Sequence, residues 1–79
     1  MIEISQVKET IAKQMIVECG GIQYYPVSYR LTLDTKANQW LHTMEMHDLR
    51  ANSITVAPLK NITIVEGKVF KDGKIIDAR

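Results

Sequence analysis

The chain has 79 residues, of which 46% are hydrophobic and 24% are charged, and its formal net charge is +1. These values are typical of one small globular domain over residues 1–79 and exclude a disordered chain. No block of basic residues stands out, so the electrostatic footprint of a dedicated nucleic-acid binder is missing. No apolar run approaches the roughly eighteen residues that a membrane-spanning helix needs, and we therefore expect no membrane association.

The cysteine count limits how such a small domain can be stabilised. Domains of this size commonly add disulfides, a structural metal or a partner subunit. Cys19 is the only cysteine, so an intrachain disulfide is excluded. With His42 and His47 it gives too few ligands for a structural zinc, which needs roughly four. Self-association is the remaining option. The single cysteine and the lack of a signal-peptide pattern also favour the reducing cytoplasm.

The first regular element is predicted to be a short helix over residues 3–13. Its apolar residues are spaced three, four and four apart, as on one face of a helix: Ile4, Val7, Ile11 and Met15. Ser5 is a candidate N-cap, and the charged residues in between supply a polar side. A strand is the alternative, because Val7, Ile11 and Met15 share odd parity with Val17.

A strand is predicted over residues 15–19, followed by Gly20-Gly21 and a second strand from Tyr25. Apolar residues alternate with polar ones along the second strand, as in a half-buried antiparallel strand: Tyr25, Val27, Tyr29, Leu31 and Leu33. A two-residue turn would pair Val17 with Tyr24 and leave Val17 on the face opposite Tyr25. We therefore predict one extra residue in the turn, which pairs Val17 with Tyr25. Pro26 cannot donate to a ladder, so it should lie at an edge or a bulge.

The following strand starts at Trp40, after a polar connection over residues 34–39. The expected cross-strand pairs match apolar residues on one face: Leu33 with Trp40, Leu31 with His42, Tyr29 with Met44 and Val27 with Met46. This assignment makes Met44 and Met46 packing residues rather than metal ligands.

The last third of the chain contains several turn signals. Residues 48–53 form a predicted turn, a strand over residues 54–57 ends at Pro58, and one tight helical turn precedes a strand over residues 62–65. Asp72-Gly73 predicts a hairpin, in which Lys71 opposes Lys74, so its tip should be solvated.

Residues 49–67, LRANSITVAPLKNITIVEG, resemble the end of a small SH3-like or Sm-like barrel. Such barrels often close with a strand, one tight turn and another strand, and a preceding helix suits the Sm-like plan. The expected fold is therefore α+β, mostly β. It has a short N-terminal helix plus a five- or six-stranded antiparallel sheet, either curled or forming a small SH3-like or Sm-like half-barrel.

The residues that could carry chemistry are few and scattered. His42 and His47 are five residues apart on one strand, so they emerge from opposite faces and cannot share a metal. His42 is expected to be a core or rim histidine with a satisfied ring. Cys19 lies beside the two glycines with no base near it in sequence. We therefore predict no catalytic residue, no metal site and no cofactor.

A possible interaction surface remains on the face turned away from the core. Parity places Glu45 and His47 on that face, and Tyr24 and Arg30 also point outward if Tyr25 and Tyr29 belong to the core. The open question is whether this face meets solvent or another subunit.

The predicted function is a small intracellular, non-catalytic binding or adaptor protein that acts as a homo-oligomer. Accessory proteins of phages and mobile elements are often of this size, which makes such a role an additional expectation. One alternative is a small nucleic-acid-binding β-barrel that uses Tyr24, Arg30 and the lysines near the C-terminal hairpin. A second alternative is a thiol-based enzyme that uses Cys19 and a histidine.

Overall fold

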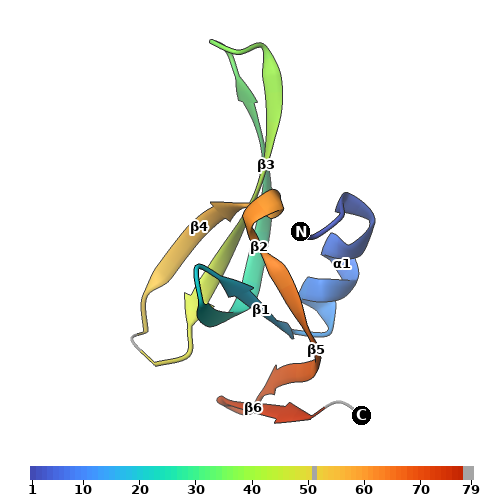
Figure 1. Cartoon of the computed structure of the whole chain (residues 1–79), viewed down its shortest axis with the longest axis vertical. Coiled ribbons are helices and arrows are strands. Elements are labelled where there is room, and N and C mark those ends of the chain that lie inside the picture. Colours follow the sequence, from blue (N-terminus) through green and yellow to red (C-terminus); the bar gives the residue numbers. More distant parts are fainter. Residues whose placement is uncertain (51, 78–79) are drawn as a thin grey trace.

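A computed structural model describes residues 1–50 and 52–77. The elements in chain order are α1 (Ile4–Ala12), β1 (Met15–Cys19), β2 (Ile22–Asp34), β3 (Gln39–Asp48), β4 (Ile54–Pro58), the 3₁₀ turn η1 (Leu59–Asn61), β5 (Thr63–Lys71) and β6 (Lys74–Asp77). The strands form one antiparallel sheet in the order β4-β3-β2-β1-β5-β6, which curls without closing (Figure 1). The predicted α+β, mostly β fold is confirmed. In the described ranges no helix is long and apolar enough to cross a membrane.

Helix α1 forms where the helical spacing predicted it, so the strand alternative is wrong. Its N-terminus is capped differently from the expectation, because the Gln6 side-chain oxygen accepts a hydrogen bond from the Glu3 N–H at 2.9 Å. Ser5 therefore lies inside the helix rather than at its cap. The helix buries Val7 and Thr10, whereas Ile4 is exposed. At the other end, a hydrogen bond from Lys13 holds the pKa of the Glu9 carboxyl below its ordinary value.

The core lies on one face of the curled sheet, against α1 and η1. Its fully or nearly fully buried members come from almost every element: Ile2, Val7, Val17, Tyr24, Met44, Met46, Ala57, Leu59 and Ile62. Met44 and Met46 are completely buried, as the strand pattern predicted. The N-terminal segment is attached to the turn, because the Ile2 N–H donates to the Leu59 carbonyl at 3.2 Å. Ile2, rather than Ile4, therefore fills the core at this end.

The β1–β2 connection is a two-residue turn, and the predicted extra residue is wrong. Cys19 pairs with Ile22 and Val17 pairs with Tyr24 across Gly20-Gly21. Both glycines have positive φ angles, 61° and 81°. Positive φ at both central positions is the conformation of the tight hairpin turn whose twist matches the strands. The register with β2 therefore places Val17 and Tyr24 on the same, buried face.

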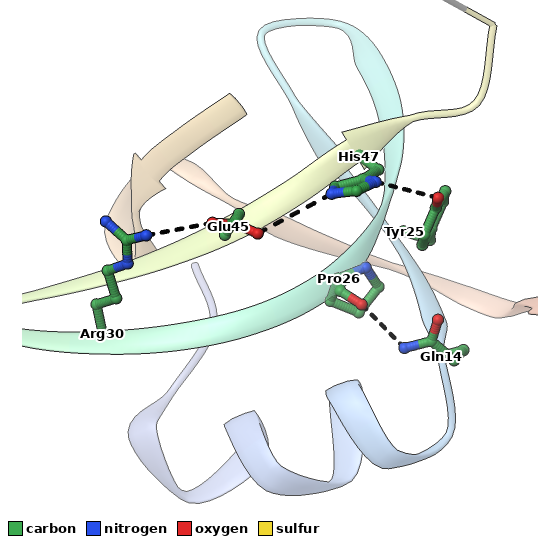
Figure 2. A network of polar contacts seen from close by, with 6 residues as sticks. All are labelled: Gln14, Tyr25, Pro26, Arg30, Glu45 and His47. Atoms are coloured by element: carbon green, nitrogen blue, oxygen red, sulfur yellow. Dashed lines mark hydrogen bonds and ion pairs between the residues drawn. The ribbon is translucent and has the colours of Figure 1, made fainter. Parts of the chain in front are cut away.

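The extra residue lies further along β2, in a bulge at Val27. Pro26 pairs with Met46 and Ser28 pairs with Glu45, so Val27 has no partner on β3. Pro26 was expected at an edge or a bulge, and it lies next to this bulge, whereas the predicted pairing of Val27 with Met46 is wrong. Because one inserted residue reverses the parity, Tyr25 faces away from the core while Tyr24 faces into it. The Gln14 side chain fixes this bend by donating to the Pro26 carbonyl at 2.9 Å (Figure 2).

Gly21 offers a direct test of the turn geometry. Replacing it with alanine is expected to lower the free energy of unfolding by about 1–2 kcal/mol, because a side chain strains the backbone at φ 81°. The added Cβ itself would meet no atom within 4 Å apart from its chain neighbours. Replacing Gly20 with asparagine should cost only a few tenths of a kcal/mol, since asparagine tolerates this conformation. Urea titrations compare the two variants, and an equal cost at both positions would contradict the turn described here.

Beyond the bulge, the remaining predicted pairs of β2 and β3 are confirmed: Tyr29 with Met44, Leu31 with His42 and Leu33 with Trp40. Neither neighbouring strand follows this ribbon to its end. Strand β1 pairs with β2 only as far as Tyr24, and β4 begins to pair with β3 at Thr43. Residues 31–42 consequently project from the body as a two-stranded ribbon, which we call the arm (Figure 1). The arm contributes to the elongated shape of 41 × 26 × 19 Å.

The C-terminal elements follow the predicted order of strand, tight turn, strand and hairpin. Turn η1 separates β4 from β5, as the resemblance to SH3-like and Sm-like barrels implies, although the sheet does not close. Lys71 pairs with Lys74 at the tip of the last hairpin, where both are exposed, as predicted. In the turn predicted over residues 48–53, residue 51 lies outside the described residues.

Candidate functional site

A chain of polar contacts runs along the outer face of β2 and β3, on the side opposite the core (Figure 2). Arg30 Nη2 lies 3.3 Å from Glu45 Oε1, and Glu45 Oε2 lies 3.9 Å from His47 Nε2. His47 Nδ1 in turn lies 3.2 Å from the hydroxyl of Tyr25. Three of the four residues predicted for an interaction surface are thus brought together, and Tyr25 joins them because of the bulge.

The Tyr25 end of this chain is covered by an aromatic ring from β5. The rings of Tyr25 and Phe70 are stacked, with centroids 4.0 Å apart and an interplanar angle of 5°. The outer face therefore has an aromatic stack at this end, beside the polar chain. The polar chain and the aromatic stack together connect three strands: β3, β2 and β5.

Tyr24, the fourth residue of the predicted surface, is not on it. Its side chain is only 6% exposed and packs in the core with Val17. The expectation of an outward-facing Tyr24 is wrong because the two-residue turn places it on the same face as Val17. Tyr24 and Arg30 consequently lie on opposite faces of β2 and cannot form one base-stacking platform.

His42 is satisfied at the rim of the core, as the sequence predicted. Its Nδ1 lies 2.6 Å from the hydroxyl of Tyr29, and the two rings stack with centroids 6.0 Å apart. Residues 1–50 and 52–77 contain no group of three or more histidine, cysteine, aspartate or glutamate side chains that could hold a metal ion. Cys19 is a free, half-buried thiol that packs against the core cluster.

The arm carries an apolar surface that the sequence analysis did not identify. Leu31, Leu33 and Trp40 lie on the same face of the ribbon and are 52%, 44% and 58% exposed. A groove of about 380 Å³ opens at the base of the arm. Its apolar lining comes from the N-terminal segment, the start of α1, the arm, the end of β4 and the start of η1: Met1, Ile2, Ile4, Trp40, Leu41, Pro58 and Leu59. The sequence did contain a signal for this surface: the alternating strand is longer than the strands predicted beside it, so part of its apolar face has no neighbour to cover it.

A second exposed apolar feature lies at the open edge of the sheet. Strand β4 is the last strand on its side, so one row of its backbone groups has no strand partner within residues 1–50 and 52–77. Ile54 and Val56 are exposed on the outer face, and the strand contains no charged residue. Natural proteins usually protect such edges with charges or bulges, so an unprotected edge is a site for pairing with another chain.

Comparisons of this chain with protein-family models, with curated proteins and with solved structures found no match.

Proposed function

We propose that the protein is a small, non-catalytic binding protein that acts as a homo-oligomer. The observation that carries this proposal is the number of exposed apolar side chains. Within the described residues, ten large hydrophobic side chains are exposed, as many as the hydrophobic residues that are buried. Single exposed apolar residues are normal on monomers. Six of the ten lie on the arm and on β4, and contiguous apolar patches of more than a few hundred Å² mark interaction sites.

The small size of the protein supports self-association in particular. A domain of this length buries only roughly 60–65% of the surface of its unfolded chain, so its own core gives limited stability. A partner that binds only the folded state adds to the free energy of unfolding by mass action. A second copy of the chain is a partner that is always present where the protein is made.

The polar groups support a binding role over catalysis. Glu45 is shared between Arg30 and His47, and the remaining nitrogen of His47 contacts the Tyr25 hydroxyl. These groups satisfy one another on the outer face, where Glu45 and His47 lie beside Val56 and Ile54 of β4, and none of them lines the arm groove. A nucleophilic cysteine needs an activating base or a positive helix end beside it. The Cys19 thiol instead packs against apolar core residues.

The proposal is tested by light scattering on a dilution series of the purified protein. We expect the apparent mass to reach at least twice the 9.0 kDa of one chain at high concentration and to fall on dilution. A constant mass of one chain up to the highest soluble concentration would contradict the homo-oligomer.

A further inference from the structure

We infer that two copies of the chain dimerise through the arm, with the face formed by Leu31, Leu33 and Trp40 packed on the same face of the partner's arm. The groove at the base of each arm then receives apolar side chains from the other copy. This inference rests on the proposed homo-oligomer and names its interface. The dimer is isologous, because the same surface is used by both copies.

The arm is an ordered element with an uncovered face. Its tip is fixed by the Asp34 carboxylate, which accepts hydrogen bonds from the N–H groups of Lys36 and Ala37 at 3.1 and 3.3 Å. At its base, Tyr29 and His42 are joined by the 2.6 Å contact. An isolated two-stranded ribbon is marginally stable in water, and a third layer or strand is needed for independent stability. A surface that packs on Leu31, Leu33 and Trp40 would supply that layer.

The area of the exposed apolar surface fits a dimer. The groove joins Trp40 to Met1 and Ile4, and with Leu31 and Leu33 they form one surface of about half-exposed side chains. An aromatic side chain has about 150–250 Å² of surface. If the four aliphatic side chains are taken at the lower end of that range, the five at about half exposure supply on the order of 500 Å² of apolar area. A standard interface buries about 800 Å² per partner, of which roughly 60% is apolar. The apolar part of such an interface is therefore already present.

The charges favour a second copy as the occupant. The net charge of the chain is only +1, so two copies repel each other little. The ionised side chains that line the groove are those of Glu3 and Lys60, which are exposed and opposite in sign. In an isologous dimer, Glu3 of one copy can face Lys60 of the other, so the rim of the interface is self-complementary.

The experiment compares two variants that introduce the same charge on two differently placed apolar sites. Leu33→Glu changes the arm, and Val56→Glu changes the β4 edge on the outer face; the two wild-type side chains are 44% and 48% exposed. Leu33→Glu is expected to weaken dimerisation at least about tenfold in light scattering, because it places a charge in the centre of a desolvated interface. Val56→Glu is expected to leave the dimer unchanged.

Trp40 gives a second readout that needs no variant. It is the only tryptophan, so its fluorescence reports on the arm alone. On dilution of the wild-type protein, we expect its emission to shift to longer wavelength in parallel with the fall in mass. Circular dichroism checks that both variants fold. If Leu33→Glu does not fold, the change of the wild-type Trp40 emission on dilution tests the arm interface.

The two proposals fail in distinguishable ways. A wild-type protein that stays monomeric overturns both. A dimer that Val56→Glu dissociates and Leu33→Glu leaves intact overturns the arm interface and keeps the homo-oligomer, with β4 as its contact. A dimer whose dissociation leaves the Trp40 emission unchanged also overturns the arm interface.

Discussion

Replacing Ile62 with alanine is expected to lower the free energy of unfolding by about 2–5 kcal/mol. The Ile62 side chain is 0% exposed and belongs to the core cluster that the sheet shares with α1 and η1. The substitution removes apolar contacts and leaves a cavity. The Ile62 N–H donates to the Leu59 carbonyl at 3.1 Å, and this bond limits how far the segment can move to fill the space. A domain of this size has a total stability of about 4–12 kcal/mol, so the loss is a large fraction of it.

Urea titration measures this loss, and Ile54→Ala is the matched control. It removes the same atoms from a side chain that is 59% exposed at the sheet edge, and it should cost less than about 1 kcal/mol. Both variants and the wild type are compared at one protein concentration, because self-association makes the midpoint concentration-dependent. Equal losses at Ile62 and Ile54 would contradict the burial that distinguishes them.

The elements that could be predicted from the sequence are those whose signals are local. The helical spacing of Val7 and Ile11, the apolar match of Leu33 with Trp40, and the turn signals at Pro58 and Asp72-Gly73 each involve residues close in the chain or one hairpin apart. Such signals depend on side-chain periodicity and on the conformations that proline and glycine prefer. They were sufficient for the fold class and for the hairpins of β2 with β3 and of β5 with β6, whereas the pairing of β1 with β5 joins segments far apart in the chain and was not predicted.

The bulge at Val27 could not be located from periodicity. A mismatch between Val17 and the Tyr25–Leu33 alternation showed that one residue had to be inserted, and the glycines offered an obvious position. The structure inserts it after Pro26, where the missing N–H weakens the ladder. A one-residue shift exchanges the two faces of a strand. The misplaced insertion therefore assigned Tyr25 to the core and Tyr24 to the outer face, the reverse of their positions in the structure. The predicted interaction surface was wrong at Tyr24 for that reason.

The arm shows a second limit of sequence reasoning. The alternation from Tyr29 to Leu33 predicts a strand with one apolar face, and that face is normally covered. Whether it is covered depends on the lengths of β1 and β4, which have five residues each beside thirteen in β2. The exposed side chains of Leu31, Leu33 and Trp40 thus follow from a comparison between elements, which periodicity within one strand does not include.

The position of Tyr25 leads to the second large expected effect. Replacing Tyr25 with alanine should lower the free energy of unfolding by about 2–3 kcal/mol, less than for a fully buried aromatic ring because Tyr25 is half-buried. The change removes the stack on Phe70, with its 4.0 Å centroid distance, and the contact with His47. Urea titration at one protein concentration measures the total.

Tyr25→Phe and Phe70→Ala separate the two contributions. Tyr25→Phe keeps the ring and loses only the 3.2 Å contact with His47, so it should cost at most about 1.5 kcal/mol. Tyr25→Ala and Phe70→Ala remove the same stack, so the double variant should lose about 0.5–1.5 kcal/mol less than the sum of the single losses. Strict additivity would mean that the rings do not stabilise each other. The outer face would then be connected across β2, β3 and β5 by its polar contacts alone.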